Sequence, residues 1–206
     1  MYKYYTKLLK VLLNTDDITS EQLKSVDKLY RFKQTDLQTL PRVKEIIGIL
    51  KSLQYDISSI VDFGSQRGAL LFPLLDLFPN LNFTAVDLDS NIIQFLKQLE
   101  SNSEYNLKVI QADITKPIQG VSDKSVDVVL ASEILEHLEY PEMAIKEAMR
   151  IAKQYIIITV PSKPDDNPEH IQYFTLEDIK KLFDEYNISS INIHPNAKYN
   201  LFMVTI

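Results

Sequence analysis

Two kinds of hydrophobic pattern alternate along most of this chain. Short continuous apolar runs, typical of strands buried on both faces, are spaced through the sequence. They cover residues 57–63, 82–88, 107–112, 126–131 and 155–160. Between them, apolar positions recur at helical spacing in residues 69–78, 92–99 and 141–152. Alternating strands and helices predict a mostly parallel sheet with helices on both faces.

The two ends of the chain have different patterns. Residues 1–55 have helical character, with a capping-box pair at Thr19 and Gln22 and a second helix expected from Pro41. A last helix is expected over 175–186. The strand-like segments 190–193 and 201–206 have no helix between them, so we expect an antiparallel hairpin at one edge of the sheet. We divide the chain into an N-terminal helical segment, 1–40, and a main domain, 41–206.

Composition narrows the classes of protein that fit. The chain has 206 residues, a formal net charge of −6 and no cysteine. The charge argues against a broad nucleic-acid-binding surface, and the absence of cysteine excludes disulfides and thiolate chemistry. Lys10 interrupts the apolar N-terminus, so we expect no signal peptide. No run reaches the ~20 apolar residues that a membrane span needs. We expect a soluble, cytoplasmic protein.

Two glycines follow the first predicted strand. Residues 62–68 read Asp-Phe-Gly-Ser-Gln-Arg-Gly, which places Gly64 and Gly68 four residues apart. Gly64 suits a tight turn and a close approach to a ligand, and Gly68 suits close packing of the next helix. The loop lacks the third glycine of a dinucleotide fingerprint and the Lys-Ser/Thr of a phosphate loop. A nicotinamide dehydrogenase is therefore disfavoured, although a plain structural turn stays open.

Aspartates end the next two strands. Asp87 follows the second strand and can accept hydrogen bonds from two ribose hydroxyls. Asp113 follows the third and can accept from an adenine amino group, with Ile114 against the ring. Either aspartate could instead cap a helix or order a turn. Ligands of such sheets bind at the carboxyl ends of the strands, where these residues are expected to meet.

Together these segments resemble the class I S-adenosylmethionine-dependent methyltransferases. Segment 62–68 is similar to their first motif, with Gln66 where a glycine is common. Segments 125–129, 132–142 and 170–175 resemble their later motifs, and the last of these is seen in many small-molecule members. The resemblance implies a Rossmann-like three-layer sandwich with seven strands, S-adenosylmethionine as the cofactor and methyl transfer as the activity. The implied donor-binding residues are Asp62, Gly64, Ser65, Gly68, Asp87, Leu88, Asp113, Ile114 and Ser132.

Four side chains are candidates for the acceptor side of the site. Glu133, Glu136 and His137 stand at i, i+3 and i+4, which would share one face of a helix. His137 or His170 could act as a general base. Alternatively, all four could bind a divalent cation. Their Glu-x-x-Glu-His pattern with a later histidine resembles one in the Hen1-like RNA 2′-O-methyltransferases, where a metal could orient vicinal hydroxyls. A surface glutamate pair and a histidine packed beneath a lid is the plainest interpretation.

The expected acceptor is a small molecule, methylated at oxygen or nitrogen. Aromatic side chains of the N-terminal segment could close over its pocket, or pack on the core or on a second copy in a homodimer. These side chains are Tyr2, Tyr4, Tyr5, Tyr30 and Phe32. Two alternatives stay open. One is the metal-assisted RNA enzyme, which the negative charge disfavours, and the other is a noncatalytic donor-binding module, for which Gln66 is the only support.

Overall fold

The computed structural model describes residues 10, 17, 19, 21, 37–102 and 105–206. Gln22 of the expected capping box and the aromatic side chains of the N-terminal segment lie outside the described residues, so both expectations stay predictions. None of the helices in the described part of the chain combines the length and the apolar character needed to cross a bilayer.

A seven-stranded sheet forms the centre of the molecule, with strand order β3-β2-β1-β4-β5-β7-β6. Its strands are β1 (Ser59–Phe63), β2 (Asn82–Asp87), β3 (Leu107–Gln111), β4 (Val126–Ser132), β5 (Ala152–Pro161), β6 (Ser190–Pro195) and β7 (Tyr199–Thr205). The first five strands are parallel. β7 lies antiparallel between β5 and β6, which confirms the predicted C-terminal hairpin. The strand order changes direction between β1 and β4, the position at which open α/β sheets bind ligands.

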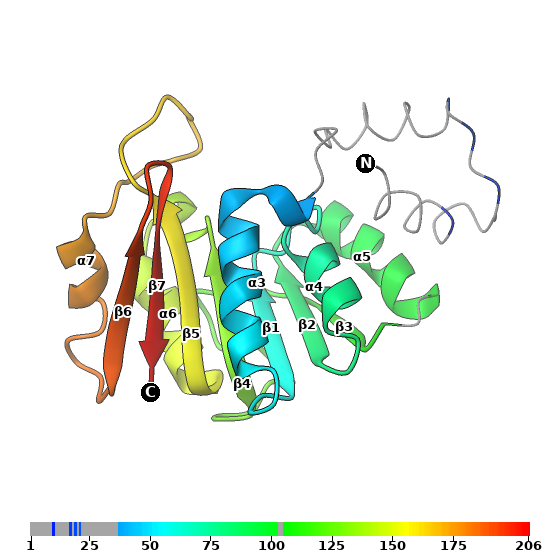
Figure 1. Ribbon diagram of the computed structural model, residues 1–206, viewed down its shortest axis with the longest axis horizontal. Coiled ribbons are helices and arrows are strands. Elements are labelled where there is room, and N and C mark those ends of the chain that lie inside the picture. The colour runs from blue at the N-terminus through cyan, green and yellow to red at the C-terminus, as the bar shows by residue number, and fades with distance from the viewer. Residues whose placement is uncertain (1–9, 11–16, 18, 20, 22–36, 103–104) are drawn as a thin grey trace.

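Helices cover both faces of this sheet, as Figure 1 shows. Core residues of α3 (Pro41–Leu53), α4 (Leu71–Leu77) and α5 (Ser90–Asn102) pack on one face, and those of α6 (Pro141–Ile151) and α7 (Leu176–Lys181) pack on the other. Side chains alternate along each strand, so Val128 belongs to the first core cluster and Val129 to the second. This is the predicted three-layer architecture, and Pro41 begins α3 as expected.

Three local expectations are corrected. β1 begins at Ser59 rather than at residue 57, and α7 ends at Lys181 rather than at residue 186, although the capping box of Thr175 and Asp178 is present. Strand and helix do not alternate without a break, because residues 112–125, between β3 and β4, contain no helix. Pro117 lacks an amide hydrogen and Gly120 has φ +80°, so this connection forms turns rather than a helix.

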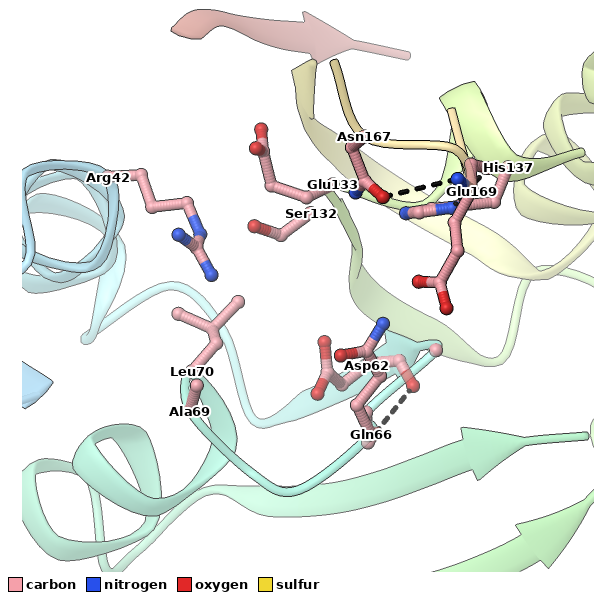
Figure 2. A pocket seen from close by; sticks show the side chains of 12 residues that line it. Arg42, Asp62, Gln66, Ala69, Leu70, Ser132, Glu133, His137, Asn167 and Glu169 are labelled. Carbon is pink, nitrogen blue, oxygen red and sulfur yellow. Dashed lines mark hydrogen bonds between the residues drawn. The ribbon is translucent and has the colours of Figure 1, made fainter. Parts of the chain in front are cut away.

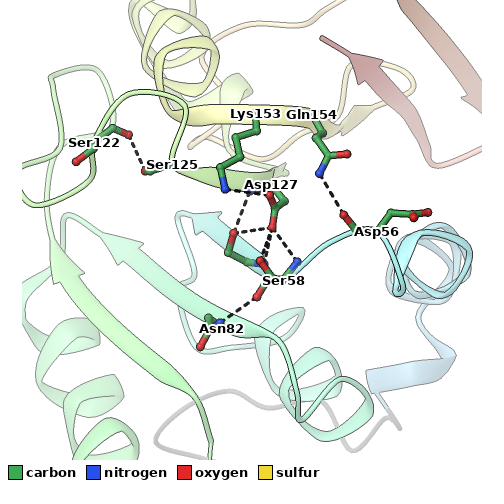
Figure 3. Close-up of polar contacts among 9 residues, drawn as sticks. Asp56, Ser58, Asn82, Ser122, Ser125, Asp127, Lys153 and Gln154 are labelled. Carbon is green, nitrogen blue, oxygen red and sulfur yellow. Dashed lines mark hydrogen bonds and ion pairs between the residues drawn. The ribbon is translucent and has the colours of Figure 1, made fainter.

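A buried aspartate joins the amino-terminal ends of β1 and β4, two central strands of the sheet (Figure 3). Asp127 Oδ2 accepts hydrogen bonds from the amide and hydroxyl groups of Ser58 and Ser59, at 2.7–3.0 Å. Lys153 Nζ lies 3.3 Å from the other oxygen. Burial alone would raise the pKa of Asp127, but these donors hold it well below its usual range. The contact fixes β1 against β4 at the end opposite their carboxyl tips.

Candidate functional site

A cavity of about 210 Å³ opens at the carboxyl ends of β1 and β4 (Figure 2). Side chains and backbone from the β1 tip, the β4 tip, α3 and the loop after β5 enclose it. The lining residues are Arg42, Asp62, Gly64, Ser65, Gln66, Ala69, Leu70, Ser132, Glu133, His137, Asn167 and Glu169. The cavity therefore lies at the switch in strand order, where the sheet topology predicts a ligand site.

The glycine turn after β1 is shaped by its packing. Gly64 has φ +66°, and a Cβ there would lie 2.6 Å from Ile134 Cδ1. Gly68 has φ +77°, and its Cβ would lie 2.5 Å from the Phe72 ring. Neither position can take a side chain without displacing a packed neighbour. The expected role of Gly68 in helix packing is borne out, because Phe72 belongs to α4.

The residue at the unusual loop position adopts a conformation that glycine usually adopts. Gln66 has φ +45°, in the left-handed region, and its amide donates a 2.8 Å hydrogen bond to Asp87 Oδ2. Gln66 and Arg67 are both exposed, so neither side chain is buried where it would block the cavity. The loop thus keeps a turn that suits glycine while carrying a glutamine side chain.

An acidic and a basic side chain line the same cavity. Asp62 is only 3% exposed. Its burial raises the pKa to about 7; contact with the Ser65 hydroxyl opposes the shift, and the charge of Asp87 adds to it. Arg42, on the first turn of α3, extends into the cavity with its Nε buried and without a hydrogen-bond partner. The cavity can therefore take a ligand that carries both a positive and a negative group.

The predicted donor residues that follow β2 and β3 also lie at the carboxyl ends of the strands, but they do not line this cavity. Asp87 is buried and accepts from the amides of Gln66 and Asp89, which leaves further lone pairs on its carboxylate. Leu88 is 66% exposed beside it, whereas Ile114 is buried in the core. Their predicted contacts with ribose and adenine stay predictions.

The third aspartate of the predicted adenosine site is already engaged by its own turn. Asp113 Oδ1 accepts from the hydroxyl of Thr115 at 2.6 Å and from its amide at 3.0 Å, and Oδ2 pairs with Lys116 Nζ at 2.9 Å. The Thr115 hydroxyl is the main cause of a pKa lowered to about 2. A contact with an adenine amino group would share an acceptor that these groups use.

The glutamates after β4 do not form the expected helical face. Only η2 (Leu135–His137), a short 3₁₀ segment, is helical, and Glu133 precedes it with φ +53°. Glu133 lines the cavity, where burial raises its pKa, with Arg42 as the main opposing charge. Glu136 is fully buried, which corrects the surface-pair interpretation. Burial raises the pKa of Glu136 to about 8, a contact with its own backbone amide opposes the shift, and no other residue forms a hydrogen bond with its carboxylate oxygens.

The two candidate histidines lie against each other. Their ring centroids are 4.8 Å apart in an edge-to-face arrangement. His137 Nδ1 lies 2.9 Å from the carbonyl oxygen of Glu169, and His170 Nδ1 lies 2.9 Å from Asp165 Oδ1. His137 lines the first cavity, and His170 lines a neighbouring one of about 220 Å³ in the loop after β5.

Sequence reasoning missed three polar lining residues: Arg42, Asn167 and Glu169. No motif marks them, because they reach the cavity only through the packing of α3 and the return of the loop after β5. The third histidine, His194, lies 3.3 Å from Glu45 Oε1 of α3, so it ties the hairpin to that helix and stands apart from the pair.

Comparison with protein families identifies this arrangement. Residues 61–158, which run from β1 to β5, match the family model described as "Methyltransferase domain". This central part of the chain is therefore similar to methyltransferase domains. The seven-stranded sheet between two layers of helices is the architecture that the resemblance implied.

Curated relatives match a little under half of this chain. Human tRNA N(3)-cytidine methyltransferase METTL6 is 29% identical over 99 residues, which cover 46% of this chain and 35% of that protein. A probable (S)-tetrahydroprotoberberine N-methyltransferase 2 from Papaver bracteatum is 29% identical over 93 residues, which cover 45% of this chain and 25% of that protein. The matched part is therefore about a third or less of each relative's length.

Solved structures share the fold of the methyltransferase domain. A SAM-dependent methyltransferase from Aquifex aeolicus superposes with a TM-score of 0.65 at 13% identity, covering 92% of this chain and all of that one. The methyltransferase domain of a bacterial Hen1 protein, CtHen1-C, gives 0.66 at 18% identity, covering 83% of this chain and 99% of that one. At these identities the likeness concerns the fold alone.

Proposed function

We propose that this chain transfers a methyl group from S-adenosylmethionine to a small-molecule acceptor, at oxygen or nitrogen. One observation carries the proposal. Buried Asp62 and the unpartnered Nε of Arg42 both line the cavity beside the glycine turn. The amino-acid tail of the donor carries an ammonium and a carboxylate, and these two side chains complement that pair of charges.

The residues present fit the donor. Asp62 would accept from its ammonium group, and Arg42 would donate to its carboxylate. Ser65 and Ser132 add hydroxyl groups to the same wall. Asp87 and the exposed Leu88 lie on the adjacent strand tip, where the ribose and adenine would extend. Bound there, S-adenosylmethionine supplies an electrophilic methyl group on its sulfonium sulfur.

The side chains of the cavity would act chiefly by positioning. Holding acceptor and donor in line supplies much of the rate of such a transfer without covalent participation of the protein. His137 lines the cavity with Nδ1 held toward the Glu169 carbonyl. Its Nε2 is then the nitrogen that can take the proton from an acceptor hydroxyl or amine.

A small molecule is the acceptor that the charge of the chain favours. The net charge of −6 disfavours a polyanionic partner. By their names, the two relatives act on a cytidine of tRNA and on (S)-tetrahydroprotoberberine, both at nitrogen. A nitrogen or oxygen of a compact organic molecule entering beside His137 is the simplest partner.

Metal-assisted 2′-O-methyl transfer to RNA is the second candidate function. The observation that favours it is the proximity of Glu136, His137 and His170, which each place a ligand atom within 4.8 Å of the others. The acidic charge of the chain opposes it. A noncatalytic donor-binding module is the third candidate, and the exposed side chain of Gln66 gives it little support because the turn itself is kept.

Calorimetric titration with S-adenosylhomocysteine, the demethylated product, tests donor binding first. We expect one site per chain. A methyl-transfer assay with isotopically labelled donor and panels of phenols, amines and short RNA then tests the acceptor. Transfer to RNA in preference to every small molecule would favour the second function. Donor binding without transfer to any acceptor would favour the third, and absence of donor binding would overturn the proposal.

A further inference from the structure

We infer that Tyr199 and His194 are positioning residues for the donor, because they hold the carboxylate of Glu45 and so keep it from neutralising Arg42. The inference rests on the proposed function, in which Arg42 binds the carboxylate of the donor's amino-acid tail. Glu45, His194 and Tyr199 are not among the residues that line the donor cavity. Their effect on the donor would therefore pass through Arg42, which does line it.

Arg42 and Glu45 have the spacing of an ion pair within a helix. They stand at i and i+3 on α3, so their side chains leave the same side of the helix, where opposite charges attract each other. Arg42 nevertheless extends into the donor cavity (Figure 2), with its Nε buried and without a hydrogen-bond partner. Glu45 pairs instead with the C-terminal hairpin. A carboxylate that could compete with the donor for Arg42 is therefore drawn to the other side.

The hairpin engages both oxygens of the Glu45 carboxylate. The Tyr199 hydroxyl donates a 2.6 Å hydrogen bond to Oε2, and His194 Nδ1 lies 3.3 Å from Oε1. Tyr199 is 5% exposed and belongs to the first core cluster, so packing fixes the direction of its hydroxyl. Burial, and next the hydrogen bond to Glu45, raise the pKa of Tyr199, so the hydroxyl stays protonated and remains a donor.

The start of β7 lies close to the donor cavity. Tyr199 pairs with Pro161, the last residue of β5, so it stands at the carboxyl end of that parallel strand, the end at which the cavity opens. The charges of Arg42 and Glu133, two cavity residues, both act on the Tyr199 hydroxyl, in opposite directions. The side chain that holds Glu45 is thus near the guanidinium group that Glu45 would otherwise neutralise.

Removal of the Tyr199 hydroxyl should weaken binding only of ligands that carry the amino-acid tail. In Tyr199→Phe the ring is kept, and the released Glu45 would pair with Arg42 and repel the carboxylate of the ligand. We expect the variant to bind S-adenosylhomocysteine about 3- to 5-fold more weakly in calorimetry at pH 8, the effect of one partly exposed ion pair. 5′-Methylthioadenosine lacks the tail, so its affinity should not change.

A second substitution separates this role from a purely structural one. Glu45→Gln, added to Tyr199→Phe, removes the competing charge without restoring the hydrogen bond. We expect the double variant to recover the wild-type affinity for S-adenosylhomocysteine. If the hydroxyl only anchored the hairpin to α3, the double variant would bind as weakly as the single one, and that result would overturn the inference. Equal losses for S-adenosylhomocysteine and 5′-methylthioadenosine in Tyr199→Phe would overturn it as well.

Another tyrosine of the chain provides a matched control. The Tyr186 hydroxyl pairs with Glu185, and its ring packs against the second core cluster, on the opposite face of the sheet. Tyr186→Phe should therefore bind both ligands as the wild type does. If Tyr199→Phe does not fold, His194→Gln decides, because the His194 side chain is 43% exposed and its loss releases the other oxygen of Glu45. This variant should also lose affinity for S-adenosylhomocysteine alone, and unchanged affinity would refute the inference.

Titration of Arg42→Gln with the same two ligands distinguishes failure of this inference from failure of the proposed function. A loss of affinity for S-adenosylhomocysteine in Arg42→Gln, with none in Tyr199→Phe, leaves the proposed donor site standing and removes the role of Tyr199. Unchanged affinity in Arg42→Gln removes Arg42 from the donor site, and the inference with it. Losses confined to S-adenosylhomocysteine in both variants, with recovery in the double variant, support both proposals.

Discussion

The ionisation of Asp62 should control donor binding. Burial raises its pKa to about 7, so its carboxylate is about one-tenth ionised at pH 6 and about nine-tenths ionised at pH 8. If the ionised form binds the donor's ammonium group, the affinity for S-adenosylhomocysteine should rise about tenfold between these pH values, or about 1.4 kcal/mol.

Asp62→Asn removes the charge with little change of shape. We expect the variant to bind S-adenosylhomocysteine about 10- to 150-fold more weakly at pH 8, since a hydrogen bond to a charged group contributes about 1.5–3 kcal/mol. The rise in affinity with pH should also disappear. Calorimetric titrations at pH 6, 7 and 8 measure both effects.

Two controls isolate the contribution of Asp62. 5′-Methylthioadenosine lacks the amino-acid tail, so its affinity should be independent of pH and unchanged in the variant. Glu133 is the other cavity carboxyl whose pKa burial raises, and Glu133→Gln should keep the tenfold rise. Two outcomes would refute the reasoning: an affinity for S-adenosylhomocysteine that still rises with pH in Asp62→Asn, or a wild-type affinity that decreases as the pH is raised.

The same shift has a consequence for stability. The folded state keeps a proton on Asp62 that the unfolded chain releases above pH ~4, so the free energy of unfolding should fall as pH rises from about 4 to 7. For a pKa shift of this size, the free energy of unfolding can fall by about 4 kcal/mol in total. Urea unfolding of the wild type and of Asp62→Asn across this range should show a shallower fall in the variant.

Three further substitutions test other parts of the structure. Asp87→Ala should weaken S-adenosylhomocysteine binding by about 1–3 kcal/mol in calorimetry; an unchanged dissociation constant would remove Asp87 from the donor site. Asp127→Asn should lower the free energy of unfolding by about 2–4 kcal/mol at pH 7, and the difference from wild type should shrink as pH falls and the carboxyl is protonated. Its donor affinity should not change, and a loss there would contradict a purely structural role. Gly68→Ala should destabilise the chain by at least about 1–2 kcal/mol in urea unfolding, because of its positive φ and the Phe72 ring; equal stability would show that the ring moves aside freely.

Local sequence determined the elements of this fold. The apolar runs are long enough only for strands, and the helical segments between them have one apolar face, so an α/β sheet follows from burial alone. The absence of a helix between β6 and β7 similarly required an antiparallel hairpin. The turn residues Gly64 and Gly68 were visible because few other residues adopt positive φ.

Tertiary structure decided which side chains meet. Arg42 is far from Asp62 in sequence, and only the packing of α3 places both on one cavity. The loop after β5 brings Asn167 and Glu169 to the same wall. Periodicity placed Glu133, Glu136 and His137 on one helical face, but the backbone at Glu133 turns to φ +53°, so Glu133 does not continue the helical segment of the other two.

The charge of a buried group likewise depends on its surroundings. Nothing in the sequence distinguishes Glu136 from an exposed glutamate, because burial and the absence of hydrogen-bond partners arise only when distant segments pack around it. The sequence by itself therefore determined the elements of the sheet, the glycine turn and the similarity to methyltransferases. The electrostatics of the cavity and the approach of His170 to His137 were set by the folded chain, since they depend on contacts between residues remote in sequence.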